Sequence, residues 1–330
     1  MPLNLTQQWD KYAKHLAKSK APIIVGPWRS EVGFELLYWL PFLCHFRKKY
    51  GIEKDRIIAL GRGGSSAWYD AAGHADLYEF LPVETVRHLT LIDQKATGSV
   101  KQQKTNDWET HVTALAAAAL GIQKYHVLSP SWMYQLVAPW WEGRQPIRWL
   151  DKYLLQPVTL AAPALEPELA AKLPTDYLAM RWYVRATWPH REDLILWMRK
   201  LTDAAARQMP VILIDSPLHV DDHGDINLGD IPNVTRLSSL TDQTPLTNLA
   251  VQSAVIARAK GYLGTYGGMA QGAMRWGVPT LSFYHTFAGT SHNHLALTQH
   301  LSLRTNVPFI AALPGHIEPF ISLLTHKEAE

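Results

Sequence analysis

The chain has 330 residues, of which 47% are hydrophobic and 18% charged, and its net charge is +3 at pH 7. This composition excludes a disordered chain, and the dispersed lysines and arginines form no basic stripe of the kind that binds nucleic acid. The single cysteine, Cys44, excludes an intramolecular disulfide and a cysteine-based metal cluster. Because the length exceeds the usual range of one domain, we expect two.

The amino-terminal stretch MPLNLTQQWDKYAKHLAKSK reads as a short amphipathic helix without the apolar core of a signal peptide. The most apolar stretch, FELLYWLPFLC, is too short to span a bilayer. We therefore expect a cytoplasmic protein, and peripheral association with a membrane surface stays open.

The first half shows the pattern of a parallel α/β sheet. Two apolar runs, PIIVG ending at Gly26 and RIIALG ending at Gly61, flank a helical stretch from about Glu31 to Tyr50 that Pro41 should kink. Two further strands are expected at 89–92 and 125–128, with the alanine-rich helix TALAAAALG between them. These elements predict a Rossmann-like domain over residues 1–155.

The second half repeats this rhythm. Residues 156–174, rich in proline and alanine, are typical of a linker. A second Rossmann-like domain is then predicted over 175–330, with helices near 192–207, 246–260 and 268–276. Its expected strands are YLAMRWY, VILIDS, NVTRLSS, GYLGT and TLSFY.

A glycine-rich segment, GYLGTYGGMAQGAMRWGVPTLSFY, covers residues 261–284. GYLGT is expected to be a strand, and the helix after it begins near Gly268, so its free N–H groups and positive dipole end would form an anion site. Glycine at 267 and 268 would let a phosphate approach the backbone closely. A tight turn without a ligand is the alternative interpretation.

The same segment resembles the donor-binding half of the GT-B superfamily of nucleotide-sugar glycosyltransferases, and distantly its heptosyltransferase-like and fucosyltransferase-like members. The resemblance implies an α/β fold with two Rossmann-like, doubly wound domains facing across a cleft. The residues that match the family pattern are Thr265, Gly267, Gly268, Ala273, Gly277, Pro279 and Tyr284. By resemblance, the donor diphosphate is bound at Gly264, Thr265, Tyr266, Gly267 and Gly268.

Arginines follow the first expected strand of the second domain, in TDYLAMRWYVRATWPHRED. Guanidinium groups at the carboxyl end of a strand suit bidentate contacts with phosphate oxygens. We expect Arg181 and Arg185 to bind the diphosphate. For Arg191, a surface pairing with Glu192 or Asp193 is an equal alternative.

Two carboxylates, Glu31 and Glu35, lie one helical turn apart in GPWRSEVGFELLYWLPFL. A sugar hydroxyl that attacks an anomeric carbon must lose a proton, which such a carboxylate can accept. The segment looks similar to the first loop of heptosyltransferase-like enzymes, in which an acidic residue is the base. The spacing to Pro41 favours Glu35 and the position in the loop favours Glu31, while helix capping or pairing with an arginine is the alternative for both.

Two further segments carry polar side chains. The loop DSPLHVDDHGD, residues 215–225, could ligate a metal through His219, Asp221, Asp222, His223 and Asp225, but we favour a loop near the nucleotide and expect no metal and no cofactor. The run GRGGSS, residues 61–66, suits an acceptor, a phosphate or a flexible turn. His285 could lie beside the donor sugar. In the alternative, its segment is purely structural and Ser291 caps a helix there. The expected nucleotide or sugar contacts are Ser216, His219, Asp222, His223 and His285.

These patterns predict a glycosyltransferase whose partners are a nucleotide-sugar donor and a glycan or other hydroxyl acceptor. A sugar-nucleotide 2-epimerase, which shares the fold, and a non-catalytic nucleotide- or sugar-binding protein are the alternatives. The identities of donor and acceptor, the stereochemical course and the oligomeric state are left open by the sequence.

Overall fold

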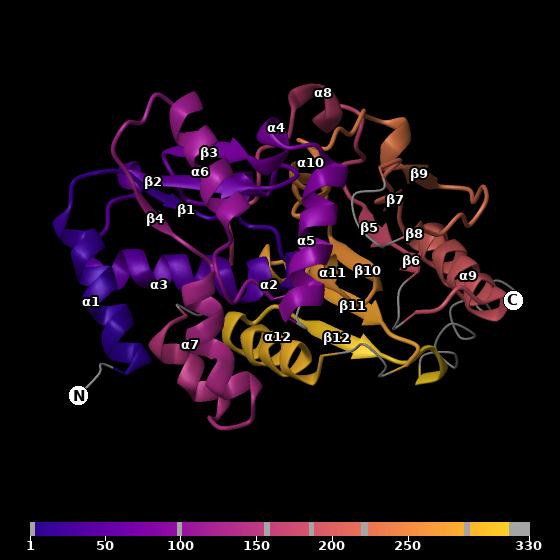
Figure 1. The fold of residues 1–330 in the computed structure, drawn as a ribbon. Coiled ribbons are helices and arrows are strands. Elements are labelled where there is room, and N and C mark those ends of the chain that lie inside the picture. The colour runs from indigo at the N-terminus through magenta and orange to yellow at the C-terminus, as the bar shows by residue number, and fades with distance from the viewer. Residues whose placement is uncertain are drawn as a thin grey trace, which may run out of the picture. The chain divides into compact units, whose positions relative to one another are not determined.

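A computed structural model describes residues 4–97, 101–154, 159–184, 188–218, 224–286 and 291–316. The chain forms two compact units, the first from Met1–Val158 together with Pro245–Ala250, the second from Thr159–Thr244 together with Val251–Glu330. The sequence predicted a continuous second domain, whereas residues 245–250 group with the first unit. Figure 1 shows unit 1 in indigo to magenta and most of unit 2 in red to yellow.

Unit 1 contains a four-stranded parallel sheet within its described residues, in the order β3-β2-β1-β4. The central strand β1 pairs Ile23 with Ile57 of β2 and with His126 of β4. All three residues of β1 are buried, as expected for a strand covered on both faces. The strands are β1 (Ile23–Val25), β2 (Ile57–Gly61), β3 (Gly73–Asp76) and β4 (His126–Leu128).

The helical stretch predicted after β1 is divided into three segments. α2 (Val32–Phe34) leads into a π-helix over Glu35–Trp39, and α3 (Leu40–Tyr50) follows with Pro41 in its first turn. A proline inside a helix clashes with the carbonyl of the residue four positions earlier, and a π turn is one way in which the backbone accommodates such a position. This local widening places Glu35 at the start of the π turn.

The remaining helices of unit 1 include one correction. Residues 89–92, expected as a strand, lie within the helix α5 (Val83–Thr97). Short apolar runs do not distinguish the two structures, and Pro82 immediately before α5 is the usual start of a helix. The other helices are α1 (Leu5–Lys18), α4 (Leu77–Phe80), α6 (Asp107–Ala119) and α7 (Ser131–Trp141).

Unit 2 contains a six-stranded parallel sheet within its described residues, in the order β12-β11-β10-β5-β7-β9. Counted along the chain, this is the strand order 6-5-4-1-2-3 of the doubly wound Rossmann fold. The predicted class of fold, with Rossmann-like α/β units, is therefore confirmed. The strands are β5 (Leu178–Arg181), β7 (Val211–Leu213), β9 (Val234–Arg236), β10 (Gly261–Thr265), β11 (Thr280–Phe283) and β12 (Phe309–Ala312), and β6 (Tyr183–Val184) pairs with β8 (Gly224–Asp225).

The core of unit 2 lies between this sheet and α9 (Glu192–Gln208) and is rich in tryptophan. Trp182, Trp188 and Trp197 pack against one another with ring centroids 5.7 to 6.0 Å apart, and Phe283 of β11 contacts Trp182 and Trp197. These tryptophans are core residues rather than exposed sugar platforms. The other helices are α8 (Pro167–Ala170), α10 (Asn248–Ile256), α11 (Gly268–Arg275) and α12 (His292–Thr305).

In the part of the chain that the structure describes, each helix is too short or too polar to cross a bilayer.

Candidate functional site

Each sheet has one place where the strand order changes direction. In unit 1 it lies between β1 and β4, and in unit 2 between β5 and β10, which are neighbours in their sheets. In parallel α/β sheets, the connections leave such a pair of strands toward opposite faces, and ligands bind at the carboxyl ends beside that crevice. The predicted site residues are therefore considered at these two edges, one in each unit.

At the edge of unit 2, Arg181 ends β5 and lies opposite Gly264 of β10. Its side chain is mostly buried, with 13% of it exposed. Nη1 donates to Oε1 of Gln252 at 2.7 Å, and Nη2 lies 3.6 Å from Oδ1 of Asp225. The shorter of these two contacts is thus to a neutral amide.

A chain of hydrogen bonds leads from Arg181 toward the neighbouring strands. Nε2 of Gln252 donates to Oε1 of Gln243 at 3.1 Å, and Nε2 of Gln243 donates to the carbonyl of Asp215 at 2.8 Å. The carboxylate of Asp215 lies 3.7 Å from Nη1 of Arg236, at the end of β9. The two arginines are therefore joined through side chains whose amides orient one another.

The glycine-rich turn places three predicted residues at the end of β10. A Cβ on Gly264 would lie 2.1 Å from the carbonyl oxygen of Arg181, so glycine is required there by the packing of β10 on β5. The hydroxyl of Thr265 is buried and accepts from the backbone N–H of Tyr183 at 3.2 Å. Tyr266 is also buried, and its phenol accepts from Nε2 of Gln271 at 3.3 Å. The side chains of Thr265 and Tyr266 thus hold the turn in place.

Gly267 and Gly268 form the start of α11, as predicted. Gly267 is the N-cap residue and has extended backbone, while Gly268 is the first helical residue and is partly exposed. The first N–H groups of a helix have no acceptor within it, and the helix dipole makes that end positive. The turn and the helix start follow β10, which pairs with the strand that Arg181 ends, and this is the arrangement expected for an anion site.

The other predicted contacts of unit 2 are described only in part. Ser216 donates its backbone N–H to Oδ2 of Asp225 at 2.8 Å, the carboxylate that also pairs with Arg181. His285 lies 3.0 Å from Nη1 of Arg191, and Arg191 also pairs with Asp193, as one alternative for Arg191 anticipated. Arg185, His219, Asp222 and His223 lie outside the described residues, as does Asp221.

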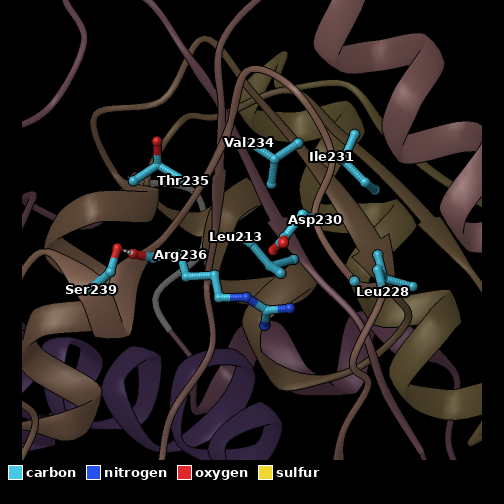
Figure 2. A pocket seen from close by; sticks show the side chains of 9 residues that line it. Leu213, Leu228, Asp230, Ile231, Val234, Thr235, Arg236 and Ser239 are labelled. Atoms are coloured by element: carbon cyan, nitrogen blue, oxygen red, sulfur yellow. Dashed lines mark hydrogen bonds between the residues drawn. The ribbon is translucent and has the colours of Figure 1, made fainter.

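The neighbouring region of unit 2 contains a pocket of about 390 Å³. Four apolar and four polar side chains line it, and Figure 2 shows Leu213, Val234 and Ile231 around it, with the Arg236 side chain extending beneath Leu213. Nη2 of Arg236 donates to Oδ1 of Asn227 at 2.8 Å, which fixes the guanidinium at the pocket. The lining is completed by Leu228, Gly229, Asp230, Thr235 and Ser239. The size and lining suit a small organic ligand with a flat, partly polar body.

At the edge of unit 1, the two candidate bases have opposite surroundings. Glu31 is exposed and is the N-cap residue of α2, but its side chain makes no capping hydrogen bond. Glu35 has no exposed surface. Its Oε1 accepts from Ser65 Oγ at 2.8 Å and from Tyr69 OH at 2.5 Å. In this structure, only Glu31 is accessible to a substrate hydroxyl.

Burial raises the pKa of Glu35 to about 7, although the hydrogen bond from Tyr69, the charge of Arg62 and the hydrogen bond from Ser65 each act in the opposite direction. Asp76, which ends β3, behaves similarly. Burial raises its pKa to about 6, against the effect of hydrogen bonds from the backbone N–H groups of Gly64 and other residues. Two carboxyls with raised pKa values therefore lie at one sheet edge, as is common at functional sites.

The loop that carries Glu31 is fixed by a buried ion-pair network. Nε of Arg29 donates to Oε1 of Glu109 at 2.5 Å, and Nη2 of Arg29 lies 3.2 Å from Asp93. Gln102 accepts from the backbone N–H of Arg29 and donates to the carbonyl of Pro27 at 2.8 Å. The loop is thus held through the side chain of Arg29 and through the backbone of Pro27 and Arg29, which Gln102 binds.

One basic side chain lies near the exposed carboxylate. Nζ of Lys101 lies 3.9 Å from the ring centroid of Trp141 and 5.5 Å from that of Phe34. Burial lowers the pKa of Lys101, and the charge of Glu31 acts to raise it. At this edge, therefore, the charged groups of Lys101 and Glu31 lie beside the aromatic rings of Phe34 and Trp141.

Among the described residues, no group of three or more His, Cys, Asp or Glu side chains is arranged to hold a metal ion. Of the possible ligands named in the 215–225 loop, Asp225 is the one within the described residues, and it accepts from the backbone N–H of Ser216 and lies 3.6 Å from Arg181.

Sequence reasoning did not identify Gln252, Gln243, Tyr69 or Asp76. One signal was present, because Gln252 interrupts the apolar helix NLAVQSAVI and is fully buried. Asp76 ends a strand, GHAD, whose sequence has few β-forming residues. Gln243 and Tyr69 lie in irregular segments, where local sequence gives no pattern.

A comparison with protein-family models and one with curated proteins give no match. Among solved structures, the chain is similar to an Escherichia coli heptosyltransferase with ADP, at 13% identity and a TM-score of 0.45, over 92% of this chain and 99% of that one. It is also similar to the E. coli ADP-heptose lipopolysaccharide heptosyltransferase II, at 11% identity and a TM-score of 0.46, over 94% and 100%.

A third similar structure is the UDP-GlcNAc 2-epimerase of Methanocaldococcus jannaschii, at 10% identity and a TM-score of 0.36, over 94% of each chain. At such identities and TM-scores these likenesses assign no activity to the chain.

Proposed function

We propose that the protein is a glycosyltransferase that transfers a sugar from a nucleotide-sugar donor to an acceptor hydroxyl. The observation that carries the proposal is the pairing of β5 with β10 where the strand order of unit 2 reverses. That pairing brings Arg181 and the start of α11 to adjacent strand ends. A guanidinium and free helix N–H groups there suit the two phosphates of a nucleoside diphosphate.

Unit 2 is proposed to bind the whole nucleotide part of the donor. The pocket beside Arg236 would hold the nucleoside, since about 390 Å³ lies within the range of small-molecule sites. The hydrogen bonds through Gln252, Gln243 and Asp215 link this pocket to Arg181. A ligand with a flat body at one end and two phosphates at the other fits such a pair of subsites.

In the proposed reaction, the acceptor oxygen forms a bond to the anomeric carbon of the donor sugar. The bond from that carbon to the diphosphate oxygen breaks, and its electron pair leaves with the diphosphate. Arg181 and the amides of α11 stabilise the negative charge on the leaving group. Glu31 accepts the proton of the acceptor hydroxyl. We choose Glu31 over Glu35 because Glu31 is exposed and Glu35 is not.

The proposal includes no metal and no cofactor, because Arg181 and the helix dipole supply the positive charge that a divalent ion supplies elsewhere. Transfer should therefore be unchanged in the presence of a chelator such as EDTA. Loss of transfer with EDTA, restored by Mg²⁺ or Mn²⁺, would contradict this part.

Calorimetric titration with ADP, GDP, UDP and CDP tests the donor site. The wild type should bind at least one of them, and Arg181→Ala should weaken that binding by about tenfold to a hundredfold, since a hydrogen bond to a charged group contributes about 1.5–3 kcal/mol. Arg191→Ala, which removes an exposed arginine paired with Asp193, is the matched control and should bind as the wild type does. If the wild type binds none of the four, the proposal fails.

The sugar-nucleotide 2-epimerase remains the competing activity. Incubating the protein with nucleotide sugars in the absence of an acceptor separates the two, because an epimerase converts the donor into its isomer. A glycosyltransferase needs the acceptor to form product. Replacement of Glu31 by Gln should abolish transfer while leaving nucleotide affinity unchanged, whereas a non-catalytic binding protein would show no transfer in either form.

A further inference from the structure

Glu35 is a buried carboxyl that the proposed reaction does not use. It has no exposed surface, and it lies on the π turn between α2 and α3. Its Oε1 accepts two hydroxyl hydrogen bonds, while Oε2 is buried and has no hydrogen-bond partner among the described residues. Burying a carboxylate costs free energy, and partners must compensate this cost for the charged form to be stable.

The partners of Glu35 connect it to a second loop. Ser65 and Tyr69 lie in the segment after β2, 30 and 34 residues along the chain. Ser65 Oγ also accepts from the backbone N–H of Arg62 at 3.3 Å, and Nη2 of Arg62 donates to the carbonyl of Ser30 at 2.7 Å. Ser30 immediately precedes Glu31. A continuous set of contacts therefore runs from Glu35 through Ser65 and Arg62 to the loop of the proposed base.

Four charged or titratable groups of the described residues interact with Glu35. Arg62 favours the carboxylate and Asp76 opposes it, while Tyr69 donates to it. Tyr134, on α7, also interacts electrostatically with Glu35, and its hydroxyl donates to Ser30 Oγ at 2.7 Å. Protonation of Glu35 removes the charge that attracts Arg62 and weakens both hydroxyl hydrogen bonds, because bonds to an ionised acceptor are the stronger ones.

We propose that Glu35 is a positioning residue whose carboxylate holds the segment after β2 and, through Arg62, the loop of Ser30 and Glu31, and which loosens both when it is protonated. The catalytic consequence rests on the proposed function, since it assumes that Glu31 is the base. The structural consequence does not. A pKa of about 7 for Glu35 places the change within the range of pH at which the protein can be studied.

Hydrogen exchange followed by mass spectrometry tests the positioning role. Exchange is measured in residues 28–34 and 61–69 at about pH 5.5 and about pH 8.5, on either side of the Glu35 pKa, and corrected for the intrinsic pH dependence of exchange. In the wild type, both segments should be more protected at the higher pH, by about fivefold, the effect of a hydrogen bond worth roughly 1 kcal/mol. Glu35→Gln should show the lower protection at both pH values.

Glu53→Gln, which changes an exposed glutamate of the same unit, is the matched control and should behave as the wild type does. Equal protection of both segments in wild type and Glu35→Gln at the higher pH would overturn the proposal. If Glu35→Gln does not fold, Tyr69→Phe takes its place, because it keeps the carboxyl and removes one of the two donors. Tyr69→Phe should then move the pH midpoint of protection upward, and an unchanged midpoint would also overturn the proposal.

The pH dependence of stability gives a second, independent measurement. Because burial raises the pKa of Glu35 from 4.5 to about 7, the folded state holds its proton more tightly than the unfolded state does. This contribution to global stability is fully present below the unfolded pKa and is lost as the pH rises through about 7. Its sign is opposite to that of the local protection, because global unfolding exposes the carboxyl to water, whereas loosening of the two segments removes its hydrogen-bond donors while it stays buried. As the pH rises from 4.5 to about 7, the free energy of unfolding of the wild type should therefore fall relative to that of Glu35→Gln. A difference independent of pH would contradict a titrating Glu35.

None of these measurements needs a substrate, so they separate the two proposals. If the protection and stability results hold while Glu31→Gln retains transfer, Glu35 positions the loop and the assignment of Glu31 as base is wrong. If transfer depends on Glu31 but both segments are insensitive to Glu35, the base stands and the positioning role fails.

Discussion

The two sheet edges at which the strand order reverses are built from different chemistry. In unit 1, the edge contains the buried ion pair of Arg29 with Glu109, to which Asp93 adds a second carboxylate, and the buried carboxyl of Glu35, which the charge of Arg62 stabilises. In unit 2, Arg181 is held mainly by the neutral amide of Gln252, and Asp225 lies farther away at 3.6 Å.

This difference separates two uses of a charged side chain. A buried charge that is fully paired fixes the backbone around it and has little attraction left for a ligand. A charge held by neutral acceptors keeps its field, which favours binding of the opposite charge. Unit 1 therefore has the features of a fixed loop with a titrating support, and unit 2 those of an anion site.

The largest expected effect comes from removing a buried charge in unit 1. The Arg29 and Glu109 side chains are only 4% and 1% exposed, so Arg29→Ala leaves an unpaired buried carboxylate. We expect a loss of about 3–5 kcal/mol in the free energy of unfolding, measured with a denaturant. Arg191→Ala in unit 2 is the control, and its exposed pair with Asp193 should contribute nothing measurable. Similar losses in both variants would contradict the comparison.

A smaller effect should follow from crowding the edge of unit 2. Gly264→Ala places a Cβ 2.1 Å from a backbone carbonyl of the neighbouring strand, which cannot move aside. We expect a loss of about 1–3 kcal/mol in stability, together with weaker nucleotide binding. Gly261→Ala, in the same strand, meets the flexible Leu178 side chain at 3.1 Å and the Pro279 carbonyl oxygen at an ordinary contact distance of 3.7 Å, and should lose clearly less. Equal thermal midpoints for the two variants would show that strand packing does not explain Gly264.

The smallest expected effect comes from replacing the neutral hydrogen-bond acceptor of Arg181 by a carboxylate, so that the arginine of unit 2 is paired as Arg29 is in unit 1. Gln252→Glu puts a carboxylate in place of the amide oxygen that lies 2.7 Å from Arg181, so Arg181 gains a second charged partner besides Asp225. Nucleoside diphosphates should bind about tenfold more weakly, a difference of roughly 1.4 kcal/mol. Gln208→Glu adds the same charge at the exposed end of α9 and serves as the control for net charge. Unchanged affinity in Gln252→Glu would mean that Arg181 does not contact the phosphates.

Much of the fold was predictable because its strands are short, continuous apolar runs. The runs ending at Gly26 and Gly61, and the run GYLGT, are strands of the parallel sheets. The helix of residues 83–97 was taken partly for a strand, since a run as short as LTLI fits either period. β3 and β12 were not predicted, because GHAD lacks strand-forming residues and β12 follows a helix that the pattern did not delimit.

The candidate site was predictable only where a residue adjoins a strand end. Arg181, Gly267 and Gly268 do so in the sequence itself, and the structure places Arg181 at the end of β5 and the two glycines at the start of the helix that follows the neighbouring strand β10. The roles of Glu31 and Glu35 could not be separated, because their spacing is the same on any helix. Their difference in exposure comes from the π turn and from Ser65 and Tyr69, which are distant in sequence.

By itself, the sequence determined the alternation of strands and helices, because hydrophobic periodicity and turn residues act over a few neighbours. It also determined which segments end in glycine and which carry arginine or glutamate at those ends. Only the tertiary structure decided which of these groups are buried, since burial depends on contacts between distant segments. The raised pKa of Glu35 and the neutral support of Arg181 both come from such contacts, with Tyr69 in one case and Gln252 in the other.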